Sequence, residues 1–564
     1  MLPESSNNNQ ACDRRGADLF AEVLLEEGVQ HVFGNPGTTE LPLLDALATS
    51  DINYVLGLQE ASVVAMADGY AQATGRPGIV NLHTAGGLGH AIGMILNARA
   101  ANTPLVITAG QQHTPHGVTD PLLHGDLVSI ARPNVKWAEE VQHPDHIPML
   151  LRRALQDCQS APTGPVFLSL PIDIMERRTV VDAGRSRTIE RAAIAHGIPV
   201  LAEALANIPI GRLVLVAGEE VFASRAETET VMLAETLGAP VFASSWPGHI
   251  PFPTSHPLWQ GTLPPRAEDI HAVFERFDAV LLLGGHSLIA YTFSEGPTVP
   301  VNCTLFQLAG DPHQLGRIHD TTFGITGDLK LSLRAMLSML AERLTSRSVA
   351  VTDRLAVATR DRDARRQASA ERAAREFAAP GMSPFVAAHE VLRAVGPDVP
   401  IVDEAAVTRL HVRACLNSWS ARQYQSNRSA ILGWGMPAAV GTSLGLDRAP
   451  VLCLVGDGAA LYSPQALWSA AHERLPVTFI VMNNREYNVL KRYALTQPHY
   501  RGLGPNHFIG MDLSDPAIDF LSLANSMGVP ARRITRAADI ASAVEDGLAS
   551  GAPNLIELPV SNDP

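Results

Sequence analysis

The sequence predicts an α/β protein made of doubly wound parallel sheets, with helices covering both faces of each sheet. Short apolar runs alternate with segments of helical periodicity along most of the chain, and this alternation is typical of βαβ units. A chain of 564 residues is also too long for one hydrophobic core, because domains usually contain about 100–200 residues. We therefore expect three such domains.

The composition is that of a globular protein and excludes some classes of partner. The hydrophobic fraction is 46% and the charged fraction 18%, which are ordinary values for a folded domain. The net charge of −14 argues against a nucleic-acid partner or an anionic membrane surface. The 5 cysteines include no CxxC pair, so the sequence indicates neither a disulfide framework nor a zinc site.

The N-terminus shows no targeting signal. Residues 1–14 are polar and poor in aromatic side chains, and we expect a disordered tail there. The segment has no apolar core of a signal peptide, and no run is long enough to span a bilayer. The expectation is a cytoplasmic protein with no membrane partner.

The first domain is expected to cover residues 15–185. Its apolar runs and helical periods alternate regularly, as in a parallel sheet. We expect strands at 31–37, 53–58, 78–84 and 104–110, with helices at 17–28, 39–49, 60–75 and 87–101.

Two side chains in this domain are candidates for chemistry. Glu60 stands between a strand and the following helix, where a carboxylate could be partly desolvated beside a heterocycle; alternatively it is an ordinary acid at a helix N-terminus. His83 ends a strand at the ligand edge of the sheet, although buried structural histidines are also common. The glycine-rich segment 86–93 lacks GxGxxG spacing and no acid follows it until Asp120, so a dinucleotide site is not indicated.

The middle domain is expected at 195–345 and a linker at 346–380. Strands are predicted at 213–218, 240–244, 279–285 and 304–310, without a glycine fingerprint that would require a nucleotide. Residues 353–379 interleave arginine and acids with alanine, which favours a solvated helix and linker over a binding patch.

The last domain, 381–564, contains the clearest ligand motif. The apolar strand 451–455 ends at Gly456-Asp457-Gly458, a turn whose glycines let the backbone approach a ligand. Asn484 follows the next apolar strand, 477–482, and the ends of neighbouring parallel strands are where open α/β sheets bind ligands. Asp457 and Asn484 together offer oxygen ligands for Mg²⁺, which a diphosphate would complete.

This motif is similar to the cofactor signature of the thiamine-diphosphate-dependent enzymes. Several segments of the first domain further resemble benzoylformate decarboxylase and its near relatives, which form one branch of that family. These segments are Val32 to Leu44, Leu58 to Pro77, Asn81 to Gly93, Thr108 to Gln112 and Arg132 to Trp137.

The resemblance implies roles for individual residues. Glu60 would form a hydrogen bond with the aminopyrimidine ring and help to activate the cofactor, and His83 would act as a general acid or base in the active site. Thr38 stands where the family has a serine that contacts the substrate carboxylate. The second active-site histidine of the family is matched by Tyr291 in a loose register, with His286 as a substitute. Leu122 and Leu123 match apolar positions of the substrate pocket.

The resemblance also implies a cofactor-binding set in the last domain. Leu432 falls where a large apolar side chain bends the cofactor, and the backbone of Ala430 falls where its 4'-amino group binds. The implied metal ligands are Asp457, Asn484 and Glu486, and the implied cofactor contacts are Glu60, Ala430, Leu432, Gly456, Asp457, Gly458, Ala459, Asn484 and Tyr487.

The three domains would then be pyrimidine-binding, middle and diphosphate-binding, in a homodimer or homotetramer with active sites between subunits. The first hypothesis is a decarboxylase of an aromatic or branched 2-oxo acid that uses thiamine diphosphate and Mg²⁺. The second is a carboligase or lyase of acetolactate-synthase or benzaldehyde-lyase type. The third is a non-catalytic binder, against which Glu60 counts. Whether the middle domain binds FAD or a nucleotide is left open, as is the identity of the 2-oxo acid.

Overall fold

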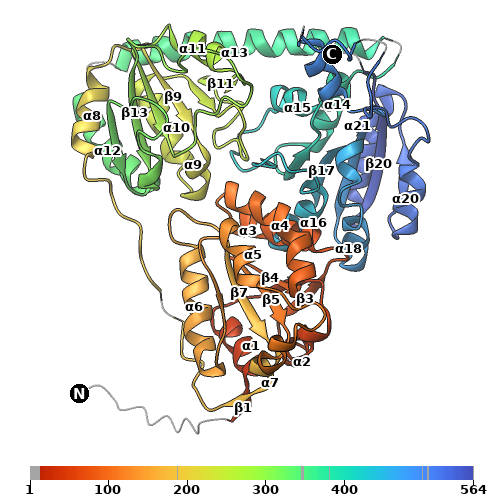
Figure 1. Ribbon diagram of the computed structural model, residues 1–564. Helices are drawn as coiled ribbons and strands as arrows, with labels where there is room; N and C mark the ends of the chain where they lie inside the picture. The colour runs from red at the N-terminus through yellow and green to blue at the C-terminus, as the bar shows by residue number, and fades with distance from the viewer. Residues whose placement is uncertain are drawn as a thin grey trace. The chain divides into compact units, whose positions relative to one another are not determined.

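A computed structural model describes residues 13–186, 188–344, 348–379, 381–497, 499–504 and 507–562. It contains three six-stranded sheets in which all strand pairs are parallel, each flanked by helices (Figure 1). The predicted fold class is therefore confirmed. Of the expected N-terminal tail, residues 1–12 lie outside the described residues, and Arg14 already belongs to a short antiparallel pair of strands, β1 (Arg14–Arg15) and β8 (Arg178–Thr179).

The first sheet has the strand order β3-β2-β4-β5-β7-β6. Helix α1 packs against α2, α6 and α7, whereas α3 packs against α4, so two groups of helices cover the sheet (Figure 1). The strand order reverses between β2 and β4, and such a switch point is where ligands bind in open α/β sheets. The strands are β2 (His31–Gly34), β3 (Asn53–Leu56), β4 (Gly78–His83), β5 (Leu105–Gln111), β6 (Ala138–Glu140) and β7 (Val166–Pro171), and the helices are α1 (Gly16–Glu26), α2 (Leu41–Leu47), α3 (Glu60–Thr74), α4 (Thr84–Ala100), α5 (Leu127–Ala131), α6 (Ile147–Cys158) and α7 (Ile172–Glu176).

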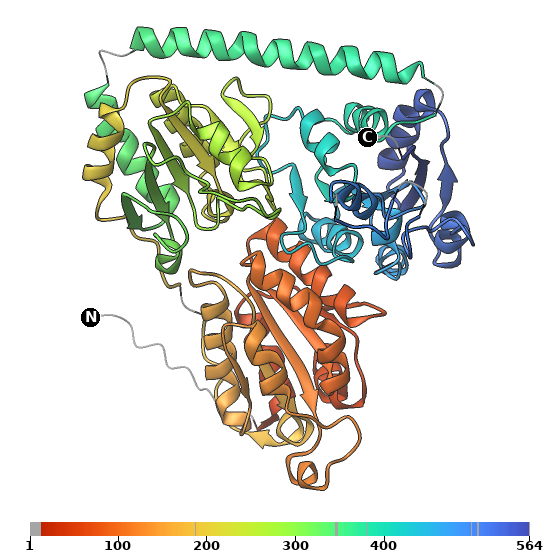
Figure 2. The ribbon, with the colours of Figure 1, turned by 45° about the horizontal axis from the view of Figure 1, so that its top comes forward.

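The middle sheet has the order β11-β10-β9-β12-β13-β14. The predicted charged helix is α13, one continuous helix that runs along the top of Figure 2. The strands are β9 (Leu213–Ala217), β10 (Val241–Ala243), β11 (Trp259–Thr262), β12 (Ala279–Leu283), β13 (Thr304–Ala309) and β14 (Phe323–Thr326), and the helices are α8 (Ile198–Asn207), α9 (Glu219–Ala223), α10 (Glu227–Leu237), α11 (Ala267–Phe274), α12 (Leu329–Arg343) and α13 (Ser348–Phe377).

The last sheet has the order β16-β15-β17-β18-β20-β19 and reverses between β15 and β17. Its central strands β17 and β18 are mostly apolar and almost entirely buried, as expected for a parallel sheet covered on both faces. The strands are β15 (Ile401–Glu404), β16 (Tyr424–Ser426), β17 (Val451–Gly456), β18 (Val477–Asn483), β19 (Ala531–Arg533) and β20 (Asn554–Pro559), and the helices are α14 (Pro384–Val395), α15 (Arg409–Cys415), α16 (Gly435–Gly445), α17 (Asp457–Ala460), α18 (Ala466–His472), α19 (Asn488–Leu495), α20 (Phe520–Ser526) and α21 (Ile540–Ala549).

The chain forms two compact units, and the division does not follow the sequence order. Of the described residues, those within 13–190, 429–448 and 465–473 form the first unit, and the others form the second. Helix α16 of the first unit packs so closely on α3 that a Cβ on Gly441 would overlap the carbonyl oxygen of Met66. In the described part of the chain, no helix is long and apolar enough to cross a membrane.

Candidate active site

A carboxylate and an imidazole meet at the switch point of the first sheet. His83 ends β4, and its Nδ1 lies 2.8 Å from Oε2 of Glu40, which follows the neighbouring strand β2. Glu40 is 2% exposed, and its carboxylate accepts the N–H groups of Gly37 at 2.8 Å and Gly110 at 2.9 Å. A carboxylate at Nδ1 favours the tautomer with the imidazole proton there, and the Nε2 atom of His83 lies outside this contact.

Close packing fixes the ring of His83 in this place. A Cβ on Gly37 would overlap the imidazole, so the ring lies directly on the glycine backbone. The hydroxyl of Thr39 lies 3.1 Å from Nδ1 and donates to Glu40 at 2.7 Å. The predicted residue Thr38 is its exposed neighbour, and its contact with a substrate stays a prediction.

Glu60 is the first residue of α3, but it does not cap that helix. The side chain of Gln59 caps α3 by accepting from the N–H of Ser62. The Glu60 carboxylate is 9% exposed, accepts from Nδ2 of Asn35 at 3.1 Å and lies 3.1 Å from Nδ1 of His90. Side chains from two other segments therefore orient this carboxylate.

Three polar residues of this site were not predicted from the sequence: Glu40, Asn35 and His90. Glu40 and Asn35 both follow β2 closely, at the sheet edge where the argument for Asp457 already applied. That position was a usable signal for Glu40. No local pattern marks His90, because its contact with Glu60 depends on the packing of α4 beside α3.

The predicted apolar pocket residues lie in the segment after the turn at 114–119. Leu122 is 89% exposed, and Leu123 is 51% exposed with a positive φ of 66°. The backbone carbonyl of Leu122 accepts from Gln112 at 3.0 Å. Their role as pocket walls stays a prediction.

The loop 429–434 precedes α16 in the first unit. Ala430 has a φ of 62° and Gly433 a φ of 98°, so the chain enters the left-handed region twice within four residues. Leu432 is half-buried and Ala430 is exposed. These are the two residues expected to contact the aminopyrimidine.

The second predicted cluster lies at the edge of the last sheet, in the second unit. Gly456 of β17 pairs with Met482 of β18, so Asp457 and Asn484 follow adjacent strands. Asp457 is 5% exposed, and its two oxygens accept from the N–H groups of Gly458 at 2.7 Å and Arg485 at 2.6 Å. Burial raises the pKa of the Asp457 carboxyl, and the hydrogen bonds from the backbone N–H groups partly oppose this rise.

These residues fit a magnesium ion bound to a diphosphate. A carboxylate and an amide oxygen follow neighbouring strands, and both are ligands that Mg²⁺ prefers. A Cβ on Gly456 would meet nothing within 4 Å, so this face of the turn is open, whereas the ring of Tyr487 covers Gly458. The carboxylate of the predicted ligand Glu486 accepts from Nδ2 of Asn488 at 2.6 Å and from Nζ of Lys491, and the role of Glu486 as a metal ligand stays a prediction.

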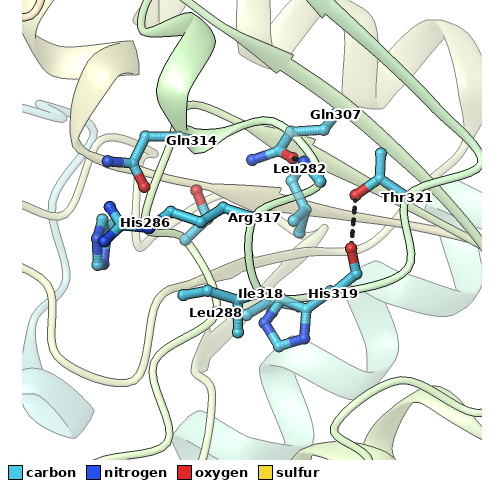
Figure 3. A pocket seen from close by; sticks show the side chains of 11 residues that line it. Leu282, His286, Leu288, Gln307, Gln314, Arg317, Ile318, His319 and Thr321 are labelled. Atoms are coloured by element: carbon cyan, nitrogen blue, oxygen red, sulfur yellow. Dashed lines mark hydrogen bonds between the residues drawn. The ribbon is translucent and has the colours of Figure 1, made fainter.

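Tyr291 and His286 both belong to the second unit. The ring of Tyr291 packs edge-on against Trp246 at 5.0 Å. His286, with a φ of 51°, follows β12 and lines a small cavity of about 20 Å³. Figure 3 shows its ring at one end of this cavity, beside Arg317, with Gln307 and Gln314 above. The participation of either residue in a proton relay stays a prediction.

Known proteins are similar to this chain in all three of its domains. Family models described as thiamine pyrophosphate enzyme match in three parts: the N-terminal TPP binding domain at residues 14–126, the central domain at 180–336 and the C-terminal TPP binding domain at 410–558. Benzoylformate decarboxylase of Pseudomonas aeruginosa is 32% identical over 95% of this chain and 97% of its own length. Acetolactate synthase isozyme 3 large subunit of Escherichia coli is 26% identical over 85% of this chain and 83% of its own length.

Solved structures of decarboxylases are similar to this chain over nearly its full length. The benzoylformate decarboxylase of Polynucleobacter necessarius superposes with a TM-score of 0.87 at 28% identity, covering 98% of this chain and 99% of its own. The thiamine diphosphate-dependent 4-hydroxybenzoylformate decarboxylase of Rhodococcus jostii RHA1 has a TM-score of 0.84 at 29% identity, covering 98% and 100%.

Proposed function

The chain belongs to the thiamine pyrophosphate enzyme family, and from this premise we propose that it decarboxylates an aromatic or branched 2-oxo acid. The products are an aldehyde and CO₂, formed without an oxidant. The relatives named as decarboxylases of benzoylformate or 4-hydroxybenzoylformate support this substrate class.

One observation carries the proposal: the pair formed by Glu40 and His83. Release of an aldehyde requires a proton on the carbon that has lost CO₂, so the site needs a positioned acid. Glu40 holds Nδ1 of His83 at 2.8 Å, so Nε2 would first take up a proton from water and then, as part of the imidazolium, pass it to that carbon. General acid–base groups of this kind contribute roughly 10²–10⁴-fold to a rate.

Other residues would bind and orient the reactants. When bound, thiamine diphosphate supplies an electron sink for the bond that breaks as CO₂ leaves. Glu60 would hold the aminopyrimidine and exchange a proton with it, while Asp457 and Asn484 would hold Mg²⁺ and the diphosphate. The Thr38 hydroxyl would donate to the substrate carboxylate. Leu122 and Leu123 would exclude water and favour an apolar substituent.

A second candidate function is carboligation, in which the same carbanion attacks another carbonyl. The similarity to acetolactate synthase of Escherichia coli favours it. Non-catalytic cofactor binding is disfavoured, because a binder has no need for Glu60 or for an oriented imidazole at His83. We further propose a cytoplasmic homodimer or homotetramer, which the molar mass in solution by light scattering would test.

A panel of 2-oxo acids tests the function. The purified protein receives thiamine diphosphate, Mg²⁺ and one acid at a time, and CO₂ and aldehyde are both measured. We expect a higher kcat/KM for benzoylformate or a similar bulky apolar acid than for pyruvate. If pyruvate is preferred and an acetolactate accumulates, the carboligase assignment replaces ours.

A further inference from the structure

A carboxylate with no catalytic assignment is buried in the middle of α3. Asp68 is 0% exposed. Its donors in the described structure are all uncharged: Nε2 of Gln72 at 2.6 Å, Nδ2 of Asn97 at 2.9 Å and Nε1 of Trp434 at 3.0 Å, with a further bond from Thr103. Burial raises the pKa of Asp68, and these donors only partly oppose the shift.

A buried carboxylate of this kind lowers the stability of the fold. A carboxylate taken from water without a cation loses several kcal/mol of solvation, roughly, and apolar residues of similar size are often more stable in its place. The packing of α3 against α4 and α16 does not by itself require a carboxylate here. Its position therefore calls for a role beyond stability.

The two oxygens of Asp68 serve different parts of the fold. Oδ1 accepts from Gln72, one turn along the same helix. Oδ2 accepts from Trp434 and from Asn97, whose own Oδ1 accepts the hydroxyl of Ser429 at 2.8 Å and its N–H at 3.3 Å. Ser429 and Trp434 are the two ends of the loop 429–434. A single oxygen atom thus connects to both ends of that loop, directly at one end and through Asn97 at the other.

The loop between these ends needs such support. The left-handed backbone of Ala430 is unfavourable for a residue with a Cβ, and conformations of this kind persist only where the surroundings enforce them. Within the loop, the Ser429 hydroxyl accepts from the N–H of Ile431 at 3.2 Å. The bonds that orient Ser429 therefore also set the course of the next two residues.

We infer that Asp68 is a positioning residue that holds the loop 429–434 in the conformation that presents Ala430 and Leu432 to the aminopyrimidine ring. The inference rests on the proposed function for the identity of the ligand, but the restraint on the loop does not. The loop is held in this conformation before the cofactor binds. Binding therefore does not include the entropy cost of ordering the loop, and the affinity for the cofactor is higher.

The test compares variants that cut the two oxygens separately. Asp68→Ala removes both, and Trp434→Phe removes the direct bond to the loop. Gln72→Met is the matched control, which removes the partner of Oδ1 and the longer bond from Gln72 to Thr103 at 3.4 Å but leaves both bonds to Oδ2. Each variant is measured for thiamine diphosphate affinity by calorimetry in the presence of Mg²⁺, for thermal midpoint, and for hydrogen exchange of a peptide covering 429–434 in the protein without added cofactor.

We expect Asp68→Ala and Trp434→Phe to weaken cofactor binding by roughly tenfold or more and to raise exchange in the loop peptide, with Gln72→Met unchanged in both. Trp434→Phe should add nothing in the Asp68→Ala background, because the bond is already lost. If Asp68→Ala does not fold, Asp68→Asn and Asn97→Ser provide the same comparison.

Two outcomes overturn the inference. One is unchanged exchange at 429–434 when Asp68 is replaced, and the other is an equal loss of affinity in Asp68→Ala and Gln72→Met. Failure of the proposed function looks different: the unaltered protein would form no aldehyde and CO₂ from a 2-oxo acid, whether or not it binds thiamine diphosphate, while the exchange of the loop peptide would still decide the role of Asp68.

Discussion

The carboxylates at the edges of the first and last sheets are held by different kinds of partner. Glu60 and Glu40 contact the imidazoles of His90 and His83, which come from other segments, although Glu40 also accepts the backbone N–H groups of Gly37 and Gly110. Asp457 is held by the backbone N–H groups of Gly458 and Arg485. The first edge brings titratable groups within hydrogen-bond distance of each other, which suits proton transfer. The second fixes an oxygen ligand, which suits a metal ion.

This difference predicts how each edge responds to substitution. Where the backbone holds a ligand, removing the ligand removes the binding site, and its neighbours change little. Where side chains hold each other, a conservative change can leave binding intact and stop the chemistry. The predictions below test that contrast, beginning with the largest effect.

Asp457→Ala should abolish cofactor retention, because Mg²⁺ would lose one of its two side-chain ligands and could no longer bridge the diphosphate. Calorimetry with thiamine diphosphate and Mg²⁺ measures this directly. Glu486→Gln is the control, since the carboxylate of Glu486 is bonded to Asn488 and Lys491, and it should retain binding. Unchanged affinity in Asp457→Ala, or full activity after dialysis against excess EDTA, would contradict the metal assignment.

Glu60→Gln should still bind the cofactor but lose most of its activity. An amide can lie beside the pyrimidine ring but cannot exchange the proton that activates C2, whereas Glu60→Ala should lose binding as well. The rate of deuterium exchange at C2, followed by quenched NMR, is the measurement. A rate equal to that of the unaltered protein would mean that Glu60 only orients its neighbours.

His83→Ala should lower kcat by roughly 10²–10⁴, the usual range for a lost acid/base group. The affinity for thiamine diphosphate should not change, because the ring packs on Gly37 and His83 is not among the expected cofactor contacts. Steady-state kinetics and calorimetry on the same preparation separate the two quantities. A parallel loss of both would show that His83 has a structural role.

Glu40→Gln should have a smaller effect in the same direction. The amide keeps the shape of the side chain but loses the charge that favours a protonated Nδ1, and a hydrogen bond to a charged group contributes about 1.5–3 kcal/mol. Steady-state kinetics should show a lower kcat than in the unaltered protein. Thr39→Val is the comparison variant, and an equal loss of kcat in it would remove the special role of Glu40.

Thr38→Ser should have the smallest effect and widen the range of substrates. The hydroxyl is kept and one methyl group is removed, which corresponds to about 0.8 kcal/mol for a buried group. The ratio of kcat/KM for a bulkier and a smaller 2-oxo acid should therefore rise by about fourfold. A ratio that stays constant would place Thr38 outside the substrate pocket.

The fold was predictable because its signals are local. Each predicted strand is present: β12 lies within the expected range 279–285, and β17 extends the expected range 451–455 by one residue. The strands β6, β7, β11, β14, β16 and β19 were not predicted. All of these except β7 have only three or four residues, which leave too little periodicity to recognise. The grouping of α16 with α3 in one unit could not be read from the sequence, because it depends on glycine contacts between distant segments.

The residues of the candidate site also fall into a group that local sequence signals predict and a group that they do not. Asp457 and Asn484 could be predicted because each directly follows an apolar strand. His90 was missed because its importance comes from the side chain that it meets across the fold. Glu40 follows β2 and could have been noticed by the rule used for Asp457, but its contact with His83 also depends on the pairing of β2 with β4. Glu486 was predicted as a metal ligand from the resemblance alone, and only the structure reveals that its carboxylate is bonded to Asn488 and Lys491.

The most direct test of the account is the product formed from a labelled 2-oxo acid. Carbon-13 benzoylformate would be incubated with the protein, thiamine diphosphate and Mg²⁺, together with an excess of pyruvate, and the products followed by NMR. The account predicts labelled benzaldehyde and CO₂ in equal amounts as the main products, and their loss in His83→Ala. Turnover of pyruvate to an acetolactate, with benzoylformate left unchanged, would contradict it.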